Sequence, residues 1–304
     1  MRYRPFGRSG SAVSAITLRL GDDVLARGPG GVRALVYAAL EAGINSFHLN
    51  TADPVLGQLA GEAFASVDRD LLMITLSLGQ SRDRKGAARD FSPEGLTGAI
   101  DQWLNVSRMG HVDLALLDEP AEEELPQSAL SALKAQRQSG RIKMLGVAGE
   151  SEVMDAYVST NAFDVLATPF NVNVPWPVRH RMRAAMERDM AVMAYGYYPK
   201  ELSTPAKAIS FHQQKRGLFG FGGSGKASDA PLAGAGTYAF LHETHGWSAE
   251  EICLTFTLTD PQIATVMVDA VAIDRLERLA ATVERDLPPG LSAQIEMARV
   301  RGAA

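Results

Sequence analysis

The sequence predicts an α/β protein, a (β/α)8 barrel of the TIM type with an N-terminal β-hairpin. Short apolar runs alternate with longer amphipathic segments along most of the chain, which is typical of parallel strands joined by helical crossovers. Eight such pairs follow one another over 304 residues, the number and length of a closed barrel. An open doubly wound sheet is the competing architecture, but no compelling phosphate-binding turn follows the first strand.

The expected elements follow in chain order. Residues 2–14 contain Arg8-Ser9-Gly10, a turn signal between short extended stretches, and predict a hairpin that seals the bottom of the barrel. The run at 71–78 is nearly continuously apolar, as in a strand buried on both faces. The expected strands cover residues 15–21, 44–49, 71–78, 112–117, 142–148, 164–168, 190–195 and 264–268.

The expected helices have apolar residues at helical spacing. One of them opens at Ser92-Pro93-Glu94, with an N-cap candidate followed by proline at the first helical position. Glu122-Glu123-Glu124 is expected to be a solvated run at a helix start. The helices are expected at residues 31–43, 54–66, from 92 onward, 126–139, 151–159, 177–188, 248–259 and 272–284.

The chain is expected to form one domain, residues 1–304, with a long flexible loop over the barrel mouth at 199–236. This loop holds Gly220 to Lys226 (GFGGSGK), which matches two phosphate-binding patterns. Both patterns need a strand before and a helix after, and neither is predicted here. A mobile glycine-rich segment at 215–232 is therefore favoured over a nucleotide site.

Composition and charge exclude several classes of function. Lys plus Arg is 30 and Asp plus Glu is 35, and a net charge of −5 excludes a broad nucleic-acid-binding face. The single Cys253 excludes an internal disulfide, and the scattered histidines predict no metal site. No apolar run is long enough to span a membrane, and the start lacks the apolar stretch of a signal peptide. We therefore expect a cytoplasmic protein without membrane or nucleic-acid partners.

Five segments together resemble one family. "RYRPFGRSGSAVSAITL", "ALEAGINSFHLNTAD", "HVDLALLDEP", "SALKAQRQSGRIKMLGVAGES" and "MAVMAYGYYP" stand in the order and spacing of the aldo-keto reductases. The resemblance covers nearly the whole chain. It implies a (β/α)8 barrel and, in the family, NADPH-dependent reduction of carbonyl groups.

The resemblance also implies a catalytic tetrad of Asp, Tyr, Lys and His, in which the tyrosine gives its proton to the carbonyl. Those four positions hold Asn50, Val55, Ser77 and Asp118 in this sequence. Val55 has no proton to give. A buried Lys–Asp pair that loses one partner strands the other charge at about 3–5 kcal/mol, and neutral Asn50 with neutral Ser77 avoids that cost. We expect that carbonyl reduction has been lost.

The family's cofactor positions depart from the pattern as well. Arg19-Leu20 replaces a Gly-Thr pair, so the Arg19 side chain is expected to enter the space of the nicotinamide. Asp269 stands where the NADPH phosphate is held and would repel it. Only Tyr195, at the ring-stacking position, is retained, so no cofactor is predicted, and NADP remains only if this alignment is wrong. The other altered positions are Ala148, Gly149, Ala167, Val271 and Leu279.

Three interpretations stay open. The favoured one is a non-catalytic binding or regulatory protein with an unknown small-molecule or protein partner. The alternatives are a non-redox enzyme of lyase or hydrolase type, with Asp118 as general base, and a divergent NADPH-dependent oxidoreductase. We further expect the Arg19 guanidinium to engage Asp118 or a neighbouring acid such as Glu150. The candidate pocket residues, all at strand ends, are Arg19, His48, Asn50, Ser77, Asp118, Glu150 and Tyr195.

Overall fold

The computed structural model describes residues 1–83, 86–202 and 238–302. Within these ranges eight parallel strands close into a barrel in the order β10-β11-β12-β3-β4-β5-β8-β9. The predicted (β/α)8 barrel is confirmed. The strands are β3 Ile16–Leu20, β4 Ser46–Leu49, β5 Met73–Leu78, β8 Val112–Asp118, β9 Ile142–Ala148, β10 Val165–Pro169, β11 Ala191–Tyr195 and β12 Ile263–Val268.

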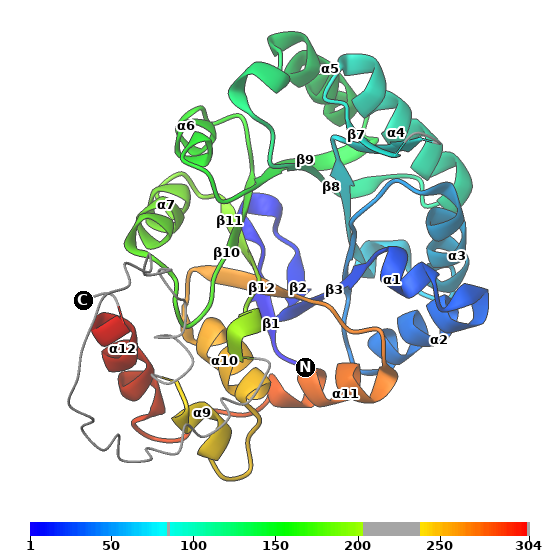
Figure 1. The fold of residues 1–304 in the computed structure, drawn as a ribbon. Helices are drawn as coiled ribbons and strands as arrows, with labels where there is room; N and C mark the ends of the chain where they lie inside the picture. The colour runs from blue at the N-terminus through cyan, green and yellow to red at the C-terminus, as the bar shows by residue number, and fades with distance from the viewer. Residues whose placement is uncertain (84–85, 203–237, 303–304) are drawn as a thin grey trace, which may run out of the picture.

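Helices surround the barrel and bury their apolar faces against it (Figure 1). The Ser92 side chain caps the helix that starts at Pro93 by accepting from the Gly95 N–H at 3.0 Å, as the sequence predicts. Glu122–Glu124 forms a single 3-10 turn before the next helix. The crossover helices are α2 Gly28–Glu41, α3 Pro54–Phe64, α4 Pro93–Ser107, α5 Gln127–Gln138, α6 Val153–Ser159, α7 Trp176–Met186, α10 Ala249–Thr259 and α11 Ile273–Thr282.

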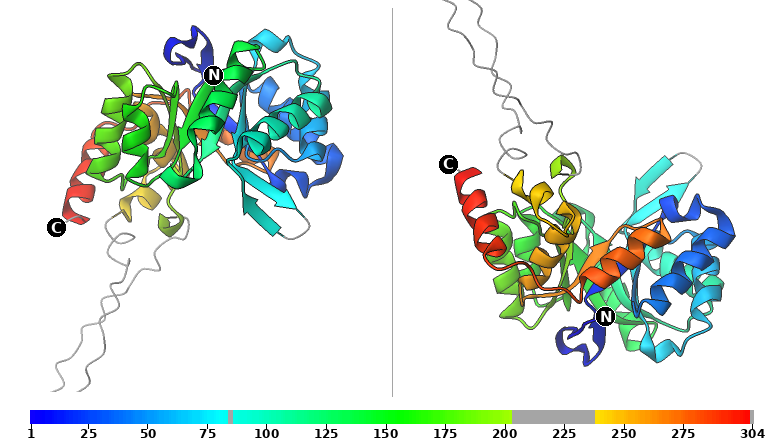
Figure 2. Two further views of the ribbon diagram at one scale, coloured as in Figure 1. Left: turned by 90° about the horizontal axis from the view of Figure 1, so that it is seen from above. Right: turned by 90° about the horizontal axis from the view of Figure 1, so that it is seen from below.

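The predicted hairpin is present at the N-terminus. Strands β1 (Tyr3–Pro5) and β2 (Ala12–Ser14) pair antiparallel, and the fully buried Phe6 between them packs with residues of the barrel interior. Figure 2 shows this hairpin at one end of the barrel, opposite the end from which β6 (Gln80–Asp83) and β7 (Gly86–Arg89) project. The N-terminal hairpin therefore closes the bottom, and the mouth lies at the other end.

The β6–β7 hairpin and three helices of the described residues were not predicted from the sequence. α1 (Asp22–Leu25) and α9 (Phe240–Glu243) are four residues long, too short to show a periodic pattern. α12 (Leu291–Gly302) lies beyond the eighth repeat, where the alternation gives no reason to expect a helix. The expected mobility of 215–232, the GFGGSGK motif and the 199–236 loop beyond Leu202 lie outside the described residues. No helix in the described ranges is both long and apolar enough to cross a membrane.

The barrel interior has a polar half and an apolar half. On the polar half, the Thr17 hydroxyl lies 2.7 Å from the Ser46 hydroxyl and 2.8 Å from that of Thr265, which links β4, β3 and β12. The opposite half is lined by Leu, Met, Val and Ala side chains of β8 to β11. Side chains alternate along each strand, so these inward residues fix which of the following residues face the mouth.

Helices α3 and α4 touch where α3 carries Gly61. A Cβ at this position would lie 2.6 Å from the Ser107 Cα, and backbone cannot move aside as a flexible side chain can. We expect Gly61→Ala to lower the free energy of unfolding by about 1–3 kcal/mol. Urea unfolding checks it. The control is Gly98→Ala at an exposed position of α4, where the new methyl meets nothing within 4 Å and is expected to stabilise the protein. Equal stability of Gly61→Ala and the parent protein would contradict the prediction.

Candidate functional site

The carboxyl ends of the barrel strands bring the predicted pocket residues to one mouth. Arg19 and His48 each stand two residues after an inward hydroxyl residue, Thr17 or Ser46, so both face the interior and are register partners across β3 and β4. Ser77, Asp118 and Tyr195 come from β5, β8 and β11. Asn50 directly follows β4, and Glu150 is the second residue after β9. Active sites of such barrels form at this end.

Arg19 lies in a cluster on one side of the mouth. Its Nε donates to Asp269, just after β12, and its Nη2 lies 3.6 Å from Asp23 on α1. The Asn50 amide is oriented so that both its oxygen and its nitrogen form hydrogen bonds. The oxygen accepts from Arg19 Nη1 at 2.5 Å, and the nitrogen donates to the Leu20 carbonyl at 3.1 Å. Each nitrogen of the guanidinium therefore has a partner in the protein.

The expectation that Arg19 engages Asp118 or Glu150 is wrong. Asp269 directly follows the neighbouring strand β12 and Asp23 is four residues away on α1, whereas Asp118 lies three strands round the barrel. The unpredicted α1 brings Asp23 into reach. Asp118 instead accepts from the Gln80 amide, the first residue of the unpredicted β6.

His48 and Ser77 form a buried pair below the rim. The His48 Nε2 lies 2.8 Å from the Ser77 hydroxyl, and 6% of the His48 surface is exposed. Burial and, second, the charge of Arg19 lower the pKa of His48 to about 3, so its ring is neutral at physiological pH. Its Nδ1 is buried without a hydrogen-bond partner among the described residues.

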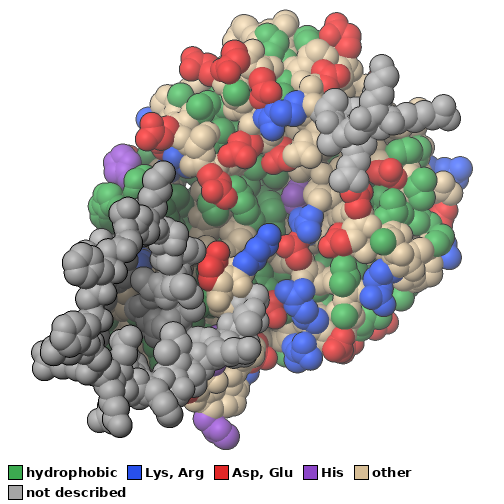
Figure 3. Space-filling view, in the orientation of Figure 1, with side chains coloured by type: hydrophobic (Ala, Val, Ile, Leu, Met, Phe, Trp, Pro, Cys, Tyr) green, Lys and Arg blue, Asp and Glu red, His purple; other side chains and the backbone are tan. Residues whose placement is uncertain are grey.

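Acidic groups gather on the other side of the mouth. Burial, and then repulsion from Glu119, raise the pKa of Asp118. The pKa of Tyr195 is raised by burial and then by Glu150, Glu119 and Asp118, so all three carboxylates act on this phenol. Figure 3 looks onto the mouth and shows acidic side chains concentrated over the ends of β8 and β9, with Lys and Arg side chains toward β3 and α1.

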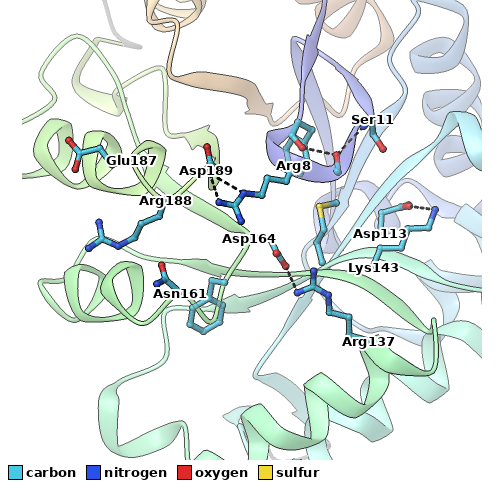
Figure 4. Close-up of a pocket in the computed structure, with 14 residues that line it drawn as sticks. Arg8, Ser11, Asp113, Arg137, Lys143, Asn161, Asp164, Glu187, Arg188 and Asp189 are labelled. Atoms are coloured by element: carbon cyan, nitrogen blue, oxygen red, sulfur yellow. Dashed lines mark hydrogen bonds and ion pairs between the residues drawn. The ribbon is translucent and has the colours of Figure 1, made fainter.

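A second hollow lies at the bottom of the barrel, against the N-terminal hairpin, with a volume of about 720 Å³. Figure 4 shows ion pairs on its walls, from Arg8 to Asp189, Arg137 to Asp164 and Lys143 to Asp113. Each of these cations already has a carboxylate of the same hollow as its partner. This charge balance favours a structural role, as is usual at this end of the fold.

Comparison with known proteins decides the family. The sequence model of the Aldo/keto reductase family matches residues 29–299. The chain belongs to the aldo/keto reductase family. The solved structure of the aldo-keto reductase AKR11C1 from Bacillus halodurans, in its holo form, superposes with a TM-score of 0.78 at 19% identity, over 98% of this chain and 96% of that one. The Pseudomonas aeruginosa protein PA4992 gives 0.66 at 17%, over 96% and 95%. Among curated proteins no match was found.

The Arg19 cluster lies at positions that the resemblance assigns to NADPH. By the resemblance, Arg19 lies at the nicotinamide position and Asp269 at the phosphate position. In the structure these two residues form an ion pair, and the Asn50 side chain accepts a hydrogen bond from Arg19. Among the described residues, no group of three or more His, Cys, Asp or Glu is arranged to hold a metal ion.

Sequence reasoning located the mouth but missed three of its residues. Asp23 on α1 reaches Arg19 on β3 because the chain turns from strand to helix between them, which the spacing of four residues does not indicate. Glu119 directly follows Asp118 and left no separate signal. Gln80 reaches Asp118 only because β6 starts there, which no local pattern indicates. Cys253 is buried in α10, as expected from its apolar neighbours.

Proposed function

We propose that this aldo/keto reductase barrel is a non-catalytic binding protein that does not reduce carbonyl groups with NADPH. The observation that carries the proposal is the Arg19 cluster. The guanidinium is held by Asp269, Asp23 and Asn50 inside the mouth. An ion pair with a hydrogen-bonded third member stands where a reductase needs an open cofactor site.

The proton chemistry of the mouth supports the same proposal. Val55, at the position of the proton-donating tyrosine, is 53% exposed and cannot transfer a proton. Tyr195 is a phenol in the mouth, but burial and three carboxylates raise its pKa. A phenol that holds its proton more tightly is a poorer general acid at neutral pH.

One contact favours the hydrolase alternative. The 2.8 Å contact between Ser77 and His48 is the geometry of a nucleophile and its base. The second requirement is a group that orients the base, and the His48 Nδ1 has no such partner among the described residues. A histidine with a pKa of about 3 is also a weak base. Ester hydrolysis that disappears in Ser77→Ala would favour this alternative over the binding protein.

The direct test is calorimetric titration with NADPH. Charged hydrogen bonds contribute about 1.5–3 kcal/mol each, and several cofactor positions have lost them. We expect a dissociation constant weaker than about 1 mM. The positive control, titrated in the same buffer, is an aldo/keto reductase that carries the complete tetrad and oxidises NADPH. A micromolar constant, or oxidation of NADPH on addition of an aldehyde, would overturn the proposal.

A further inference from the structure

Two buried polar atoms below the mouth have no partner in the described chain. They are Nδ1 of His48 and the hydroxyl oxygen of Thr75, which are register partners on β4 and β5. Residues two apart on a strand face the same side. His48 is two residues from inward-facing Ser46 and Thr75 is two residues from inward-facing Ser77, so both side chains face the barrel interior. A buried polar group without a hydrogen bond is costly, so the floor of the mouth is suited to a polar guest.

The rim above this floor has an excess of negative charge. Within the described part of the chain, the carboxylates of Asp118, Glu119 and Glu150 form no ion pair. The Glu119 carboxylate accepts the Glu150 backbone N–H at 3.2 Å, and the Glu119 carbonyl accepts from Arg89 Nη2 at 2.5 Å. All three act on Tyr195 across the mouth. This differs from the bottom hollow, where Arg8, Arg137 and Lys143 match the carboxylates.

Arg19 does not balance these carboxylates. Its charge is shared between Asp23 and Asp269, so its side of the mouth carries no excess of positive charge. Among the described residues, Arg89 is the cation that acts on Asp118, and it forms its ion pair with Glu124. Arg181 acts on Tyr195 but forms its own ion pair with Asp155. A cation entering between Asp118 and Tyr195 would therefore meet three carboxylates, while Arg89 and Arg181 are each paired with another acid.

We propose that the mouth binds a small organic cation, a primary ammonium ligand. Its charge lies against Asp118, Glu119 and Glu150, its carbon skeleton packs beside the Tyr195 ring, and an N–H points toward neutral His48. Carboxylates attract the charge, and an aromatic ring adds a cation–π contribution. The Arg19 cluster fills the β3 side, which limits the ligand to a small molecule. The inference rests on the proposed function, because a bound dinucleotide would exclude such a ligand.

Three probes of one shape test the charge preference: benzylammonium, benzyl alcohol and benzoate. NMR titration at low and equal ionic strength should give benzylammonium at least tenfold tighter binding than the alcohol, and no saturable binding of benzoate. The Tyr195 ring signals should move in the first titration. Binding of the cation should weaken as salt is added. Equal affinity for the alcohol and the cation, or no binding of the cation, would overturn the inference.

Neutral variants locate the site. Glu150→Gln and Glu119→Gln remove exposed charges and should each weaken benzylammonium binding about three- to fivefold. Glu123→Gln removes an equally exposed charge outside the mouth and should leave the affinity unchanged. An equal loss in Glu123→Gln would indicate general attraction to an acidic protein and would overturn the site. NADPH, titrated into the same samples, tests the proposed function separately: micromolar binding would overturn that function, whatever the amine does.

Discussion

Replacing Asp113 by Ala is expected to lower the free energy of unfolding by about 3–5 kcal/mol, because it strands a partly buried cation. The Asp113 side chain is 5% exposed and accepts from Arg69 Nη2 at 2.6 Å. It also accepts from the Ile74 N–H at 2.9 Å, and Lys143 lies 3.3 Å away. Arg69 is itself 19% exposed and remains tied to the Leu72 and His111 carbonyls, so it cannot turn freely to water.

Urea unfolding of three variants separates the charge from the packing. Asp113→Asn keeps an acceptor for the Ile74 N–H and should cost less than Asp113→Ala. Adding Arg69→Met to Asp113→Ala should recover part of the loss, because the stranded charge is gone. The control is Asp286→Ala, which removes an ion pair to Arg2 with 48% and 87% exposure and should cost below about 1 kcal/mol. The prediction fails if Asp113→Ala costs no more than this control.

The fold was predictable because its signal repeats. Each buried strand is a short apolar run and each helix shows an apolar stripe, so one misplaced boundary does not change the count of eight repeats. The errors concern the exact starts of two strands and a hairpin that does not belong to the repeat. Strands β4 and β5 start at Ser46 and Met73, two residues later than predicted, because apolar Ile44 precedes β4 and apolar Leu71-Leu72 precedes β5. The β6–β7 hairpin is polar at both ends and shows no alternation of apolar residues.

The position of the site could be predicted from the sequence, but the ion-pair partners of its residues could not. Strand alternation places Arg19, His48, Ser77 and Asp118 at one mouth from sequence alone. The partner of Arg19 depends on how α1 and the segment after β12 bend toward it, which are tertiary features. Asp113 likewise interrupts an apolar strand, and its partner Arg69 is 44 residues away, so no local pattern joins them.

Acidification below pH 6.5 is expected to destabilise the protein through His48. Its pKa is about 3 in the folded chain, compared with 6.5 for an unperturbed histidine, with burial as the first cause and Arg19 as the second. Between these two values the unfolded chain binds a proton that the folded chain does not. The free energy of unfolding therefore rises with pH across this window and falls as acid is added, by up to about 1.4 kcal/mol per pH unit.

At pH 4.5 the loss from His48 alone is about 2–3 kcal/mol relative to neutral pH. His111 also has a lowered pKa and adds to the trend, whereas the raised pKa of Asp118 opposes it in the acid range. The informative quantity is therefore the difference between the parent protein and His48→Asn, which keeps a polar neutral group beside Ser77. Urea unfolding should show the variant losing less stability than the parent between pH 7 and 4.5. Parallel pH profiles for the two proteins, or a His48 ring signal in NMR that titrates near pH 6.5, would show that the buried ring is protonated as easily as a free one.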